Sequence, residues 1–391
     1  MTESGPRLPR SVWALGLVSL FMDVSSEMIH SLLPVFLVTV LGASAVAVGV
    51  IEGAGEAMAS ISKLVSGWLS DRLGKRKVLT VVGYGLGALS KPLFALAPTA
   101  GWVLGARVTD RIGKGIRGAP RDALVGDLTP AGLRGAAYGL RQSLDTVGAV
   151  LGPLLAVALM ATFAGDFRLV FWVALVPGLA AVAILVLGVR EPAKVESREP
   201  AAAPVRWVDA ARLGSRFWGV VVAGSVLTLA RFSEAFLILR AEAADLPLVL
   251  VPLVLVVMNV VYAASAYPIG ALSDRRDRRR VLAVGFTVLI IADVILVLAP
   301  GLGMVMLGVA LWGLHMGMTQ GLLSALVADT APTALRATAF GVFNFFSGVA
   351  LLLASLIAGF LWDLAGAAAT FAAGAVFAAI GLIGWMVLVR R

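Results

Sequence analysis

The chain has 391 residues, of which 60% are apolar and only 14% are charged. A soluble protein needs more polar surface than this composition supplies, so the soluble classes are excluded. The absence of cysteine excludes a disulfide framework and thiol chemistry. The formal net charge of +9 does not indicate nucleic-acid binding, because most basic residues stand in short stretches between long apolar runs.

Long apolar runs recur along the whole chain, and each approaches or exceeds the roughly 20 residues that a helix needs to cross a bilayer. The runs are too long and unbroken for barrel strands. The sequence therefore predicts an all-α membrane protein with twelve transmembrane helices. The expected spans are residues 12–40, 45–70, 78–98, 101–122, 138–163, 168–189, 217–239, 247–272, 280–299, 301–328, 341–362 and 366–389.

Basic residues are distributed unequally between the two sets of loops. Asp71–Lys77 and Arg275–Arg280 are strongly basic, whereas the loops on the opposite side contain only Arg168 and Arg240. Loops rich in Lys and Arg remain in the cytoplasm. We therefore expect a multi-pass protein of the cell inner (plasma) membrane, with both termini in the cytoplasm.

Two motifs of the first half recur in the second half at nearly the same offset. Gly67-Trp-Leu-Ser-Asp71-Arg72 recurs as Gly270-Ala-Leu-Ser-Asp274-Arg275, and the stretch 123–134 recurs as 325–336. Duplicated halves around a central substrate site are a transporter architecture. We predict two pseudo-symmetric six-helix bundles, residues 1–190 and 215–391, joined by a cytoplasmic linker, residues 191–214.

The first of these motifs carries a family resemblance. Residues 67–77 resemble the loop signature G-x-x-x-D-R-x-G-R-R between helices 2 and 3 of the major facilitator superfamily, although the second copy has Asp277 in place of a glycine. Gly139, Gly148, Gly152 and Pro153 resemble the helix-5 signature of that family's proton-coupled drug and metabolite exporters, without its closing pair of glycines. The resemblance covers nearly the whole chain. It implies the major facilitator fold, a small-molecule substrate and action as a monomer.

The loop motif and its repeats predict a cytoplasmic gate, because an acidic group near a helix end can pair with a basic cluster. In the helix-5 motif, glycines let two helices approach closely, and Pro153 permits a bend. The expected gate residues are Gly67, Asp71, Arg72, Gly74, Arg76, Asp127, Arg134, Asp274 and Arg275.

Several acidic residues lie inside the expected spans, where a charge is costly unless it is paired or faces water. Asp23, Glu27 and His30 share one face of the first helix, and Glu52 and Glu56 lie one turn apart in the second. Acids exceed bases in these two helices, which favours titration. A carboxylate without a cation takes up a proton, so the substrate and the proton can compete for it. His30 suits pH sensing.

Other polar residues stand in the remaining spans, and some of them can instead form structural ion pairs that lock the halves. The residues expected to couple protons or bind substrate are Asp23, Glu27, His30, Glu52, Glu56, Asp110, Arg111, Lys114, Arg141, Asp145, Arg231, Glu234, His315, Gln320 and Asn344. Lys91 and Pro92 are expected to interrupt the third helix. Asp293 is expected to extend toward the outer membrane interface.

These patterns predict a proton-driven antiporter that exports a small organic molecule, drug-like or metabolite, across the lipid bilayer. One alternative is a ferroportin-like exporter of divalent metal ions, for which Asp23, Glu27, His30 and His315 supply oxygen and nitrogen ligands. Another is an organic anion transporter that uses the basic face of Arg111, Lys114 and Arg117. No constellation of nucleophile and base, and no nucleotide-binding loop, indicates an enzyme or a cofactor.

Overall fold

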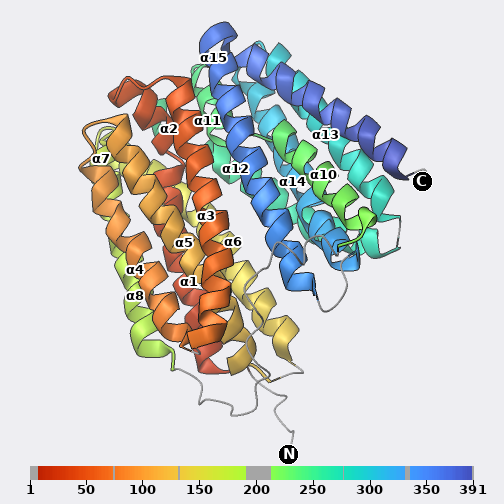
Figure 1. Ribbon diagram of the computed structural model, residues 1–391. Helices are drawn as coiled ribbons and strands as arrows, with labels where there is room; N and C mark the ends of the chain where they lie inside the picture. The colour runs from red at the N-terminus through yellow and green to blue at the C-terminus, as the bar shows by residue number, and fades with distance from the viewer. Residues whose placement is uncertain are drawn as a thin grey trace, which may run out of the picture. The chain divides into compact units, whose positions relative to one another are not determined.

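The computed structural model describes residues 8–73, 75–130, 133–190, 213–275, 277–330 and 335–389, and every regular element within these ranges is a helix (Figure 1). The prediction of an all-α chain is confirmed. The helices are α1 (Arg10–His30), α2 (Leu33–Val35), the π-helix η1 (Phe36–Val40), α3 (Ala45–Leu73), α4 (Arg76–Ala95), α5 (Ala100–Leu128), α6 (Arg134–Thr162), α7 (Phe167–Val173), α8 (Leu175–Gly188), α10 (Ser215–Ala230), α11 (Ala235–Glu242), the 3₁₀-helix η3 (Leu248–Leu250), α12 (Leu253–Arg275), α13 (Arg278–Leu298), α14 (Leu302–Thr330) and α15 (Arg336–Val389).

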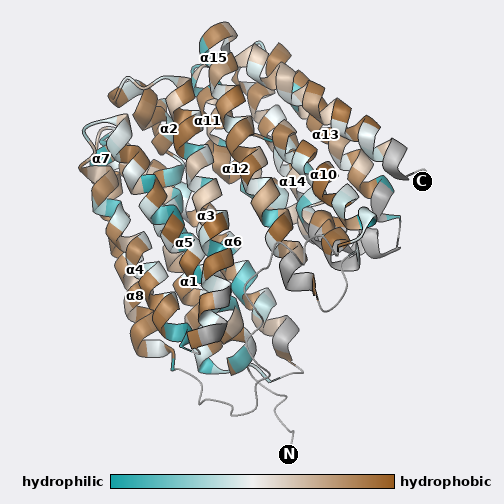
Figure 2. Cartoon of the chain, viewed as in Figure 1, coloured by the Kyte–Doolittle hydropathy of each residue, from teal (hydrophilic) through white to brown (hydrophobic). Residues whose placement is uncertain are grey.

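Ten segments of the described chain are long and apolar enough to cross a membrane. One of them, residues 339–386, holds two helical arms of α15 that meet at Gly366, whose φ of 81° favours glycine. Helix α5, with 29 residues, is also long enough to cross a membrane, but it is not among the ten because it carries many charged residues. Each of the twelve predicted spans therefore coincides with described helix. Figure 2 shows mainly hydrophobic residues along α8 and α13.

Packing contacts divide the chain into two compact units, of which the first holds residues 1–30 and 58–204. In this unit α4 packs on α5, and α1 packs on both α6 and α8. Tyr84 and Met22 lie in its apolar core with residues of α5, α6 and α8. Close helix crossings depend on glycine: a β-carbon at Gly113 of α5 would stand 2.7 Å from the backbone oxygen of Gly83 on α4.

The second unit holds residues 31–57 and 205–391. Here α14 packs on α12 and α13, and α15 packs on α10 and α13. An apolar cluster around Phe217 joins α10 to α14 and α15. The amino-terminal part of α3 lies against α15, where the side chain of Asp363 accepts hydrogen bonds from the backbone N–H groups of Ala45 and Val46 at 2.9 and 3.0 Å.

Two predicted helices are interrupted in the structure. Within the first predicted span, α1 ends at His30 and the helix resumes at Leu33. Pro34 stands in the first turn of the new helix, and its lack of an N–H group removes one helical hydrogen bond. The seventh predicted span is broken at residues 231–234, between α10 and α11. The expected interruption at Lys91 and Pro92 is wrong, because α4 continues through both residues to Ala95.

The predicted linker, residues 191–214, lies outside the described residues except for Leu213 and Gly214. The two units differ from the predicted bundles in one segment, since residues 31–57 pack with the carboxyl-terminal residues. The division into bundles at residues 190 and 215 stays a prediction.

Candidate functional site

In the first unit, two glycines of α6 lie against the two predicted acids of α1. A β-carbon at Gly148 would stand 2.9 Å from the β-carbon of Asp23, and one at Gly152 would stand 2.8 Å from that of Glu27. Both positions also contact the backbone of α1. Gly148 and Gly152 of the helix-5 motif therefore bring α6 onto the acidic face of α1. The motif predicts a close helix contact but does not identify the partner. Gly139 differs, because a β-carbon there would meet nothing within 4 Å.

The surroundings of Asp23 are rich in charge. Lys114 and Arg117 of α5, Asp145 of α6, and Glu27 all interact electrostatically with Asp23. Glu27 in turn contacts His30, whose Nδ1 lies 3.3 Å from its Oε2. The structure thus assembles acids of α1 with bases of α5, an arrangement in which one added proton or one bound charge changes the local balance.

Asp110, a predicted site residue, is held in a buried ion pair. Its Oδ1 lies 2.8 Å from Nζ of Lys91 on α4, and it also accepts a hydrogen bond from Ser90 at 3.2 Å. Nζ of Lys91 also donates to Ser26 of α1 at 3.1 Å. Sequence reasoning had not identified Lys91 as a partner. The available signal was a lysine placed alone in an otherwise apolar span.

A second charged cluster joins α1, α4, α5 and α6. Arg121 donates to Ser19 at 3.1 Å and to Asp122 at 3.1 Å. Arg141 pairs with Asp145, one turn further along α6, at 2.5 Å. The buried guanidinium of Arg117 lies over the ring of Tyr84 at 4.8 Å. Arg121 and Tyr84 were not among the predicted site residues. For Tyr84 the reason is that a hydroxyl within an apolar core leaves no spacing pattern in the sequence.

Two of the residues predicted for a cytoplasmic gate form an ion pair in the structure. Arg76, at the start of α4, lies 2.6 Å from Asp127, near the end of α5. Gly67 of α3 lies beside Ala119. Gly74 and the side chains of Asp71, Arg72, Arg134, Asp274 and Arg275 lie outside the described part of the chain. Arg111 is buried on α5, and Lys114 is exposed.

The second unit contains its own polar group. Arg231, at the break between α10 and α11, interacts electrostatically with Glu234, Glu56 and Tyr262. The hydroxyl of Tyr262 donates to Oε1 of Gln320 at 3.2 Å. Glu52 is buried, and Asn344 is half-buried on the first arm of α15. Six of the predicted residues therefore belong to one structural unit, although they come from four separate stretches of the sequence.

His315 and Asp293 are both completely buried in the second unit. Nδ1 of His315 lies 2.8 Å from the backbone oxygen of Gly285. Oδ1 of Asp293 accepts a hydrogen bond from Nε1 of Trp312 at 2.9 Å. The expectation that Asp293 extends to the membrane interface is wrong, since an indole on the neighbouring helix binds it inside the protein. Among the described residues, no group of three or more His, Asp or Glu is placed to hold a metal ion.

Relatives of this protein align with nearly the whole chain. A relative in Methanocaldococcus jannaschii, described as an uncharacterised MFS-type transporter, is 31% identical over 387 residues, covering 97% of this chain and 94% of the relative. An uncharacterised protein of Mycobacterium tuberculosis is 31% identical over 365 residues, covering 91% of this chain and 87% of the relative.

Solved structures of transporters share the fold. The nucleoside transporter NupG is 12% identical with a TM-score of 0.78, and covers 97% of this chain and 99% of its own. A bacterial homologue of the human lysosomal transporter Spinster is 17% identical with a TM-score of 0.78, and covers 97% of this chain and 96% of its own. The model of the Major Facilitator Superfamily matches residues 15–258 and 235–391. The chain is a multi-pass membrane protein that belongs to the major facilitator superfamily of transporters.

Proposed function

We propose that this transporter is a proton-coupled antiporter that exports a small organic molecule by alternating access. The observation that carries the proposal is the placement of Asp23 and Glu27 on α1, against Gly148 and Gly152 of α6. The glycines of an exporter-like motif thus make room for the two acids that the sequence predicts to titrate. We further propose that the chain lies in the inner membrane, with both termini cytoplasmic, and acts as a monomer.

The charges around Asp23 supply a chemical basis for exchange. Asp23 interacts with two bases, Lys114 and Arg117, and with two acids, Asp145 and Glu27. Asp145 forms an ion pair with Arg141, and Glu27 contacts His30. A proton on Asp23 neutralises its negative charge, and a cationic substrate group bound beside the carboxylate balances the same charge. The two ligands therefore compete for one carboxylate, which couples inward proton movement to substrate export.

The test is proton flux in proteoliposomes with a pH-sensitive dye inside, measured against a panel of cationic, neutral and anionic compounds and divalent metal ions. We expect one organic class to evoke proton movement, and Asp23→Asn to abolish it. The matched control is Asp245→Asn, because Asp245 is exposed and has a φ of 63°, a conformation that asparagine tolerates equally well. Unchanged proton-coupled transport in Asp23→Asn refutes the role of Asp23.

A second candidate, transport of an organic anion, is favoured by the buried arginines of α5. Arg107, Arg111 and Arg117 are each no more than 5% exposed. Guanidinium groups bind carboxylates and phosphates with fixed geometry. The same panel separates the candidates: a response to anions alone, lost in Arg117→Gln, supports this second function. A response to metal ions alone would instead favour metal export, the remaining alternative.

A further inference from the structure

Asp293 of α13 is a buried acid that the proposed exchange around Asp23 does not use. It is 0% exposed, and its Oδ1 accepts a hydrogen bond from the indole N–H of Trp312. Its Oδ2 has no hydrogen-bond partner among the described residues. Buried carboxylates are normally paired with a cation or satisfied by several donors. Among the described residues, one oxygen of this carboxyl group is therefore left without a hydrogen bond.

The unpartnered oxygen lies beside the break between α10 and α11. A β-carbon at Gly374, on the second arm of α15, would stand 2.7 Å from Oδ2 of Asp293. It would also stand 3.1 Å from the ring of Phe232 and 3.3 Å from the backbone oxygen of Ala230. Ala230 ends α10, and Phe232 belongs to the break. The carboxyl group thus sits where α13, the helix break and α15 meet, and only glycine at position 374 leaves room for it.

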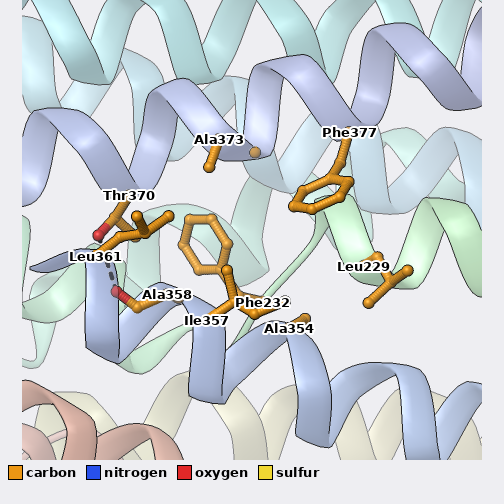
Figure 3. Close-up of a pocket in the computed structure, with 10 residues that line it drawn as sticks. Leu229, Phe232, Ala354, Ile357, Ala358, Leu361, Thr370, Ala373 and Phe377 are labelled. Carbon is orange, nitrogen blue, oxygen red and sulfur yellow. Dashed lines mark hydrogen bonds between the residues drawn. The ribbon is translucent and has the colours of Figure 1, made fainter.

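A small apolar pocket adjoins this place, and its lining includes both Phe232 and Gly374 (Figure 3). Figure 3 shows the ring of Phe232 between the two arms of α15. The arms are tied by a hydrogen bond of 2.9 Å from Oγ1 of Thr370 to the backbone oxygen of Ala358. Because two residues are shared, a movement of the break changes the pocket and the surroundings of Asp293 together.

No charged side chain pairs with Asp293 in the described part of the chain. From α14, His315 lies one turn beyond Trp312, and its Nδ1 contacts the backbone oxygen of Gly285. From the break, Arg231 interacts with Glu234, Glu56 and Tyr262. The second arm of α15 carries no titratable residue between Ala367 and Gly381. An ionised Asp293 would be a buried charge stabilised by one hydrogen bond.

We propose that Asp293 is a proton-binding site that responds to the conformation of the break between α10 and α11. A proton on Oδ2 removes the buried charge and supplies an O–H donor on the side of the carbonyl group of Ala230. Release of the proton requires water to reach Oδ2, and therefore requires the break or the second arm of α15 to move. The bound proton favours the present arrangement, and its loss favours another. Its role in transport rests on the proton coupling proposed above, whereas proton binding itself does not.

The chemistry suits a proton better than a metal ion. Calcium and magnesium ions take several oxygen ligands. In the described part of the chain, however, Asp293 belongs to no group of three or more His, Asp or Glu residues, and one of its oxygens is already bound by an indole N–H. The neutral carboxylic acid satisfies the surroundings without further ligands.

The direct test follows the proton through its neighbour, Trp312. The full chain is labelled with 5-fluorotryptophan in lipid nanodiscs, and the resonance of Trp312 among nine tryptophans is assigned by its loss in Trp312→Phe. We expect this ¹⁹F resonance to move with pH in the wild type and to be fixed in Asp293→Asn, whose amide oxygen still accepts the indole hydrogen bond. Asp23→Asn is the control and keeps the titration. The proposal is overturned if the resonance of Trp312 does not shift with pH in the wild type, or if it shifts equally in Asp293→Asn.

A transport measurement then tests the coupling. In proteoliposomes we expect the proton-driven substrate flux of Asp293→Asn to be at least tenfold lower than that of the wild type. Substrate–substrate exchange, which requires no net proton movement, is expected to be retained. Equal loss of both activities overturns the coupling role. If the wild type moves no protons at all, the proposed antiport fails, and the ¹⁹F titration still decides whether Asp293 binds a proton.

Discussion

Gly148 on α6 lies directly against Asp23 on α1, so close that a β-carbon on the glycine would stand 2.9 Å from the β-carbon of the aspartate and 2.7 Å from the backbone oxygen of Leu20. At such distances the two helices cannot both keep their positions once a side chain is added. The glycine therefore fixes where the carboxyl group of Asp23 stands relative to the bases of α5.

We predict that Gly148→Ala forces α1 and α6 apart and lowers both stability and transport. Overpacking of this kind typically costs about 1–3 kcal/mol. Gly139→Ala is the matched control, because Gly139 lies on the same helix with open space around its α-carbon. Alanine there is expected to be neutral or to stabilise by about 0.5–1 kcal/mol. Thermal unfolding in detergent and flux in proteoliposomes measure both variants, and equal behaviour of the two would contradict the close-packing argument.

A second prediction concerns the buried pair of Lys91 and Asp110, whose side chains are 1% and 6% exposed. Lys91→Met and Asp110→Asn each leave one charge buried without its partner, which typically costs about 3–5 kcal/mol. The double variant removes both charges and is expected to recover much of the loss. A double-mutant cycle on unfolding temperature measures this coupling. Lys75→Met, at an exposed position before α4, is the control, and additive losses in the cycle would show that the pair is not coupled.

The third prediction concerns Asp363, which caps α3 from another helix by accepting the N–H groups of Ala45 and Val46. Removing a side-chain cap typically costs about 0.5–2 kcal/mol. We expect Asp363→Ala to speed hydrogen exchange in the first turn of α3, and Asp363→Asn, which keeps an acceptor, to change it less. Mass spectrometry of a peptide covering residues 45–53 reads this directly. Unchanged exchange in Asp363→Ala would mean that water replaces the cap.

The sequence pattern predicted where the helices lie, because apolar length is a local property that each segment carries by itself. It also predicted that the helix-5 glycines make a close helix contact, which holds for Gly148 and Gly152 but not for Gly139. It could not predict which charge meets which, since Lys91 and Asp110 come from different helices and their pairing depends on how α4 and α5 cross.

The burial of Asp293 was missed for the same reason. The hydropathy of α13 gives no information about Trp312 on α14, and an acid near the end of a span normally extends toward water. The helix break at residues 231–234 was also missed, because Arg231-Phe-Ser-Glu234 contains neither proline nor glycine. These are features of tertiary packing, and both belong to the surroundings proposed for the proton site at Asp293.

The two basic residues that depart from the charge asymmetry of the loops, Arg168 and Arg240, have a shared structural role. Arg168 donates to the backbone oxygens of Ala95 and Ala97 at 2.7 and 2.8 Å, at the end of α4. Arg240 donates to those of Leu296 and Ala299 at 3.0 and 2.9 Å, at the end of α13. Each guanidinium satisfies carbonyl groups that the last turn of a helix leaves free, and its charge opposes the negative end of the helix dipole.

We therefore predict that Arg168→Leu and Arg240→Leu each destabilise the protein, since a hydrogen bond to a charged group contributes about 1.5–3 kcal/mol. Lysine is a point charge without the planar fork, so Arg168→Lys and Arg240→Lys are expected to recover only part of the loss. Arg190→Leu, at an exposed position beyond α8, is the control for removing one positive charge. Thermal unfolding in detergent ranks the variants. If leucine and lysine variants unfold together with the control, these arginines contribute charge alone, and the carbonyl groups at the ends of α4 and α13 are satisfied in another way.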